Sequence, residues 1–119
     1  MNAEEIIKLK KTFLYSSLES TDVFIKFFNK SILHNAVVME IFYNNVINGI
    51  SYEKLCLNIP KSLGSRSSIQ NLLNEGLDKK ILLKVENKKD KRIKNYYLSE
   101  KSSQFVKDWI KKQKIIFNS

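Results

Sequence analysis

The stretch from Ser65 to Ser99 restricts the possible folds of this chain more than any other part of it. Ser65 is a strong N-cap residue, and apolar residues at helical spacing follow it, so this part predicts a helix over Ser65–Lys80. The buried side of that helix would hold Ile69, Leu72, Leu73 and Leu77, with Gly76 near them to allow close packing. The segments ILLKVEN and RIKNYYLS predict two strands, which the charged loop KKDKR joins. The remainder of the chain is then the frame that supports this helix and hairpin.

The opposite side of the same helix has an unusual composition. It carries no acidic residue before Glu75, and each of its side chains can hydrogen-bond a base edge or a phosphate: Arg66, Ser67, Gln70, Asn71 and Asn74. A helix face selected only for solubility would normally carry Glu and Lys. The absence of acids therefore favours contact with an anion.

The charge of the chain lies almost entirely in its second half. The net charge of the 119 residues is +9, and residues 1–60 hold six lysines and six acids, which cancel. Residues 61–119 hold fifteen Lys and Arg against six Asp and Glu, which gives the whole +9. Such a one-sided excess indicates a polyanionic partner, with nucleic acid first and an anionic membrane surface second. Asn is abundant and scattered, and we interpret this as compositional drift.

The two ends of the chain predict apolar helices. One spans Ala3 to about Leu18, the aromatic segment Val23–Leu33 follows it, and another spans Glu100–Phe117. Surfaces this apolar must be covered by the core or by another chain, so a homodimer interface is expected there. Between them, Val37, Val38, Ile41, Phe42 and Val46 predict a helix that Asn48-Gly49 ends, then a very short strand at Ile50 and a helix capped by Ser51.

In this order the elements form a winged helix-turn-helix, mainly α with a small β-hairpin wing. From about Leu33 to Val106 the chain resembles the MarR-type regulators, most specifically where Asp90-Lys91-Arg92 precedes a strand ending in Tyr97-Leu98-Ser99. The resemblance implies a homodimer with one recognition helix per major groove and wings in the flanking minor grooves. It also implies that Arg92 enters the minor groove and that Asp90 holds it by an ion pair. We divide the single domain (1–119) into N-terminal dimerisation helices (1–33), a winged helix-turn-helix core (34–99) and a C-terminal dimerisation helix (100–119).

The expected function is sequence-specific binding of double-stranded DNA by a homodimeric transcriptional regulator, most simply a repressor. Lysines of the hairpin would neutralise phosphates, and the helix would read base edges. The candidate DNA-binding residues are Ser65, Arg66, Ser67, Ser68, Gln70, Asn71, Asn74, Lys88, Lys89, Asp90, Lys91, Arg92 and Lys94.

Other functional classes are less well supported. His34 is the only histidine and Cys56 the only cysteine, and the sequence has no Gly-rich phosphate loop or clustered carboxylate pair, so neither an enzyme, a cofactor nor a metal site is expected. No membrane span or signal peptide is recognised, which predicts a cytoplasmic protein without a membrane partner. Nothing in the residues predicts a small-molecule effector. The alternatives left open are a winged helix that binds protein and a non-specific architectural DNA binder.

Overall fold

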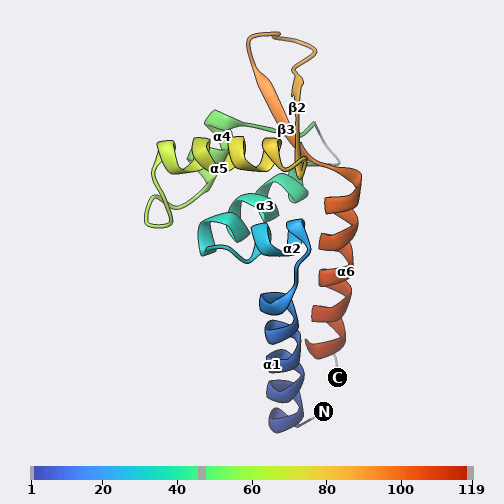
Figure 1. The fold of residues 1–119 in the computed structure, drawn as a ribbon. Helices are drawn as coiled ribbons and strands as arrows, with labels where there is room; N and C mark the ends of the chain where they lie inside the picture. Colours follow the sequence, from blue (N-terminus) through green and yellow to red (C-terminus); the bar gives the residue numbers. More distant parts are fainter. Residues whose placement is uncertain (1, 46–47, 118–119) are drawn as a thin grey trace.

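The computed structural model describes residues 2–45 and 48–117, and it combines helices with one small sheet (Figure 1). In chain order the elements are α1 (Ala3–Glu19), α2 (Val23–Phe28), α3 (Ile32–Asn45), β1 (Ile50–Ser51), α4 (Tyr52–Asn58), α5 (Arg66–Asp78), β2 (Leu82–Glu86), β3 (Lys94–Leu98) and α6 (Glu100–Phe117). This order confirms the predicted fold class, a helical domain with a β-hairpin wing.

The sheet is antiparallel with the order β1-β3-β2. Leu82 pairs with Leu98 and Lys84 with Tyr96 in the hairpin, while Ile50 of β1 pairs with Tyr96 from the other side. Because side chains alternate between the two faces of a strand, this register turns Leu82, Tyr96 and Leu98 together toward the helices. All three are buried, so the base of the wing is part of the core.

The core lies where α2, α3, α4 and α5 meet the inner face of the sheet. α3 contributes Val37, Val38 and Ile41, and α5 contributes Ile69, Leu72 and Leu73, all of them buried. The sequence expectation for Gly76 is confirmed, because a Cβ there would lie 2.6 Å from Leu82 Cδ1 and 3.3 Å from Phe27 Cζ. The recognition-type helix is therefore packed directly onto the start of the wing.

The aromatic segment that follows α1 is divided into two helices. Asp22 caps α2, whose three phenylalanines are buried, and Asn29 ends it. Ile32 then begins α3 and is 73% exposed, so the core of this chain does not cover it, and the expectation that another chain covers it stays a prediction. Val46, which was assigned to the buried side of the next helix, lies outside the described residues.

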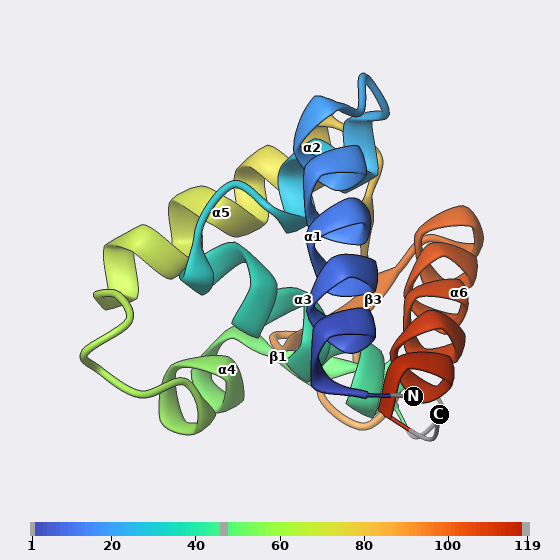
Figure 2. The same ribbon diagram turned by 90° about the horizontal axis from the view of Figure 1, so that it is seen from below.

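α1 and α6 pack against each other and extend away from the sheet, with the two termini near the same end (Figures 1 and 2). The molecule measures 52 × 26 × 25 Å as a result. Two aromatic contacts fix α6 on α2: Phe105 stacks on Phe24 at 5.4 Å between ring centroids, and Trp109 meets Phe28 edge-on at 5.6 Å. The far halves of α1 and α6 lie beyond this contact and lack a comparable core.

Candidate nucleic-acid interface

The outward face of α5 is built from small polar side chains. Successive residues of an α-helix are rotated by about 100°, so Ser67, Asn71 and Asn74 lie opposite the buried Ile69, Leu72 and Leu73. All three polar residues are exposed. Gln70 lies at the border of this face, where its Nε2 donates a hydrogen bond to Asn74 Oδ1 at 3.1 Å. The acid-free face predicted from the sequence is therefore present over the first turns of α5.

The start of α5 is capped by hydroxyl groups. Ser65 Oγ accepts a hydrogen bond from the Ser68 backbone N at 3.1 Å, and it lies 3.1 Å from Ser67 Oγ and 3.0 Å from Ser68 Oγ. A capped helix N-terminus carries partial positive charge and suits contact with a phosphate. Ser65 and Ser68 thus shape the end of the helix, whereas Ser67 also belongs to its outward face.

Arg66 does not lie on the outward face but on the edge of α5 next to α4. Its Nη2 lies 2.5 Å from Glu53 Oε1, and its guanidinium carbon lies 5.2 Å from the centre of the Tyr52 ring. Tyr52 Oη also donates a hydrogen bond to the Arg66 carbonyl oxygen at 3.0 Å. The hydrogen bond with Glu53 raises the pKa of Arg66. Sequence reasoning placed Arg66 among the base-contacting residues and did not foresee these contacts.

The other edge of α5 is tied to the α2–α3 connection through Glu75. Lys30 Nζ lies 2.8 Å from Glu75 Oε2, Lys79 Nζ lies 2.7 Å from the same oxygen, and His34 Nε2 lies 2.9 Å from Oε1. Burial by itself raises the pKa of this carboxyl, but the hydrogen bonds from Lys30, Lys79 and His34 outweigh it and lower the pKa from 4.5 to about 2. His34, the only histidine of the sequence, is a partner in this cluster.

The tip of the wing presents basic side chains in an ordered turn. Asn87 Oδ1 accepts hydrogen bonds from the backbone N of Lys89 and of Asp90, at 2.8 and 3.2 Å. The ion pair that the family resemblance implied is present: Arg92 Nε and Nη2 lie 3.1 and 3.0 Å from the two Asp90 carboxylate oxygens. That hydrogen bonding holds the pKa of Asp90 below its usual value. The Arg92 side chain is nevertheless 90% exposed, so it can reach a partner.

The lysines of the wing differ in their surroundings. Lys88, Lys89 and Lys91 are exposed and form no ion pair with any residue that the structure describes. Lys94 Nζ instead lies 2.8 Å from Glu86 Oε1 on the neighbouring strand. Of the predicted lysines, Lys94 is thus the one that already has an acidic partner.

Two asparagine side chains hold the base of the wing to the end of α3 and the residues after it, so our interpretation of asparagine as compositional drift was wrong at Asn45 and Asn95. The Asn48 carbonyl accepts hydrogen bonds from Asn95 Nδ2 at 2.8 Å and from Tyr97 Oη at 2.7 Å. Asn45 Oδ1 accepts one from the Leu98 backbone N at 2.8 Å. Gly49 has a φ of +70°, and a Cβ there would lie 2.6 Å from the Tyr97 ring. No sequence signal marked these contacts, because each joins residues about 50 positions apart.

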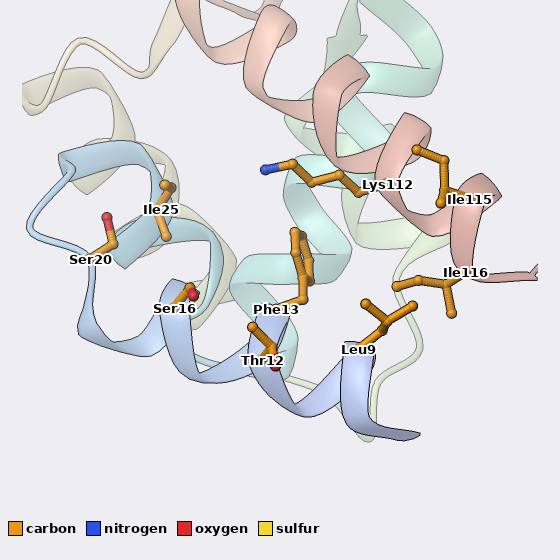
Figure 3. A pocket seen from close by; sticks show the side chains of 9 residues that line it. All are labelled: Leu9, Thr12, Phe13, Ser16, Ser20, Ile25, Lys112, Ile115 and Ile116. Carbon is orange, nitrogen blue, oxygen red and sulfur yellow. The ribbon is translucent and has the colours of Figure 1, made fainter. Parts of the chain in front are cut away.

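A second surface feature lies between α1, α2 and α6, away from the wing. It is a groove of about 400 Å³ whose walls include Leu9, Phe13, Ile25 and Ile116 (Figure 3). Lys112 Nζ lies over the Phe13 ring, 5.3 Å from its centre. Outside this groove, α1 carries further exposed apolar side chains, with Ile7 56% and Leu14 50% exposed.

The described part of the chain contains neither a membrane-spanning helix nor a metal-binding cluster. Within residues 2–45 and 48–117, no helix is both long and apolar enough to cross a membrane. The same residues contain no group of three or more His, Cys, Asp or Glu side chains that could hold a metal ion.

Solved structures with the same architecture supply the comparison. The sequence matches no protein-family model and no curated protein. S. aureus MepR bound to ethidium bromide superimposes with a TM-score of 0.60, over 99% of this chain and 76% of MepR, at 15% identity. MarR gives a TM-score of 0.52 over 91% of this chain and 77% of MarR, at 16% identity. A MepR variant bound to an oligodeoxyribonucleotide gives 0.52 over 91% and 80%, at 14% identity. Similarity at this level of identity establishes a common fold.

Proposed function

We propose that this chain, which has the winged-helix fold of the MarR-type regulators, is a transcriptional regulator that binds specific sites in double-stranded DNA as a homodimer. The observation that carries the proposal is the pairing of two surfaces. The outward face of α5 is polar and free of acids over its first turns. The neighbouring wing exposes Arg92, which is paired with Asp90, and it exposes three lysines that have no acidic partner among the described residues. The proposal is supported by MepR and MarR, whose folds are similar to the fold of this chain. One MepR variant was solved bound to an oligodeoxyribonucleotide.

The two surfaces would perform different tasks on DNA. An α-helix fits the major groove, where Asn and Gln side chains can pair with adenine through its N6 and N7 atoms. Asn71 and the Gln70–Asn74 pair are the side chains of α5 suited to this. Lys88, Lys89 and Lys91 would neutralise phosphates and release counterions, which supplies affinity that does not depend on sequence. Specificity would therefore come from α5 and affinity mainly from the wing.

Arg92 is the residue we assign to the minor groove. Arginine is attracted to narrow minor grooves by their enhanced negative potential. Asp90 fixes the direction of the guanidinium through two hydrogen bonds, so that the side chain is oriented before DNA arrives. Because Asp90 already restricts the orientation of Arg92, less side-chain conformational entropy is lost when Arg92 binds DNA.

The homodimer is supported by exposed apolar side chains on α1. Ile7 and Leu14 lie two helical turns apart and project from the same side of α1. A second copy packed on this side of α1 would cover them. Two recognition helices related by a two-fold axis would then read half-sites about one helical turn of DNA apart. Bound at a promoter, such a dimer would act most simply as a repressor by blocking polymerase.

The test is selection from a randomised duplex library at two salt concentrations, with the molar mass in solution measured by light scattering. We expect an enriched palindromic site, affinity that falls steeply with salt, and the mass of a dimer. Salt-sensitive binding without enrichment would indicate an architectural role. Absence of binding at both salt concentrations would refute the proposal and favour a protein-binding module.

A further inference from the structure

The contacts of Arg66 have a consequence for which bases the chain can select. We propose that Glu53 holds Arg66 away from the base edges, so that the amide side chains of α5 read the half-site and select A·T pairs. This inference rests on the DNA-binding function proposed above and specifies its target. Glu53 is thereby a residue that determines specificity without touching DNA.

The first step is the direction of the Arg66 side chain. Arg66 is turned by about 100° from Ser67 around the helix axis and faces α4 instead of the outward side. Two contacts keep the side chain there, the ion pair with Glu53 and the position over the Tyr52 ring, and the hydrogen bond from Tyr52 to the carbonyl oxygen holds the Arg66 backbone beside α4. Each contact joins α5 to α4, so Arg66 fastens the two helices of the helix-turn-helix.

The second step concerns the N–H donors of the Arg66 guanidinium and whether they can reach a base. Arginine recognises guanine through two parallel hydrogen bonds to O6 and N7, so the Arg66 guanidinium, whose Nη2 is directed to Glu53 on α4, would have to turn away from α4 to present two donors to a guanine. Glu53 itself lies in the first turn of α4, where the positive end of the helix dipole favours a carboxylate. A released Glu53 would also face the negative phosphate backbone without its cation. Both effects oppose the transfer of Arg66 from Glu53 to a guanine.

The third step is what remains on the outward face. Ser67, Asn71 and Asn74 are exposed, and Gln70 borders them; α5 has no arginine besides Arg66. The Asn71 side chain forms no hydrogen bond with the described residues, so its amide oxygen and its NH2 group are both open to a base, whereas Asn74 Oδ1 is already engaged by Gln70. Asn and Gln side chains pair with adenine through one donor and one acceptor. The expected half-site is therefore built on adenines opposite Asn71 and the Gln70–Asn74 pair.

The experiment compares sites selected from one randomised duplex library by the full-length wild type and by Glu53→Gln, Arg66→Ala and Glu4→Gln. Glu4→Gln is the matched control, because Glu4 is also an exposed glutamate in the first turn of a helix and its loss changes the net charge equally. Thermal unfolding of each variant shows that it is folded. Arg66→Ala tests the inference without altering Glu53.

We expect the wild type, Arg66→Ala and Glu4→Gln to enrich the same A·T half-site. Glu53→Gln should add a guanine preference at one position per half-site, enriched about fivefold or more over wild type, since a bidentate arginine–guanine pair discriminates at least this strongly. A guanine enriched by the wild type and lost in Arg66→Ala would overturn the inference and leave the DNA-binding function intact. Glu53→Gln with unchanged selection would overturn it as well. No enrichment by the wild type would refute both the inference and the proposed function.

Discussion

Replacing Glu75 by glutamine should destabilise the domain, because it removes the charge on which Lys30, His34 and Lys79 converge. A pKa lowered from 4.5 to about 2 is equivalent to at most about 3 kcal/mol of stabilisation at neutral pH. The Glu75 side chain is only 21% exposed, but its two lysine partners are more accessible and partly screened by water. We therefore expect Glu75→Gln to lower the free energy of unfolding by about 2 kcal/mol at pH 7.

The assay is urea denaturation of both proteins at one fixed protein concentration, repeated between pH 7 and pH 2, so that the proposed dimerisation would affect both alike. Because the folded pKa of Glu75 lies below its unfolded value, its stabilisation is complete above about pH 4.5 and is lost as the pH falls toward about 2. The difference between the two proteins should therefore be constant near neutrality, shrink below about pH 4.5 and vanish near pH 2.

Glu53→Gln is the control for this measurement. It breaks an ion pair whose two side chains are both exposed, and such pairs contribute about 0–1 kcal/mol. Equal stability of wild type and Glu75→Gln at pH 7 would refute the reasoning. A difference that persists unchanged to pH 2 would also refute it, because it could not then arise from the carboxylate charge.

Three further variants test separate parts of the structure. Gly76→Ala should lower the free energy of unfolding by about 1–2 kcal/mol despite the higher helix propensity of Ala, because its Cβ would collide with Leu82; a more stable variant in urea denaturation would contradict this packing. Arg92→Ala should weaken DNA binding strongly without changing the midpoint of thermal unfolding. Unchanged DNA affinity in fluorescence anisotropy would refute the assignment of Arg92 to the minor groove. Leu14→Glu should yield monomers in light scattering with the helical content retained, whereas a persistent dimer would place the interface elsewhere.

Local signals were sufficient to predict most of the helix ends. Ser51 and Ser65 each accept the capping hydrogen bond that their residue type and position indicate. Gly49 adopts the positive φ that the Asn-Gly pair suggested, and the short strand expected at Ile50 pairs with β3. These features depend on a few neighbouring residues, so the sequence contains what is needed to predict them.

The partners of the charged residues on α5 could not be predicted in the same way. Lys30 and Glu75 are 45 positions apart, and they meet only because α5 packs across the α2–α3 connection. Arg66 and Glu53 are 13 positions apart on two helices whose crossing is set by the core between them. Sequence periodicity distinguishes the buried side of a helix from the exposed side, but it does not show which neighbour flanks each edge. The division of the aromatic segment at Asn29 was missed because no glycine or proline marks it.

Because these ion pairs lie on the two edges of α5, the outward face of the helix contributes little to the stability of the fold. One edge of the helix is fixed through Glu75 and the other through Arg66, while Leu72 and Leu73 fill the core below. Substitutions of surface residues away from such features usually change stability by no more than about 0.5 kcal/mol. The residues at 67, 71 and 74 can therefore be exchanged with little change in stability, and under the proposed DNA-binding function a new target sequence can evolve, or be engineered, on an unaltered scaffold.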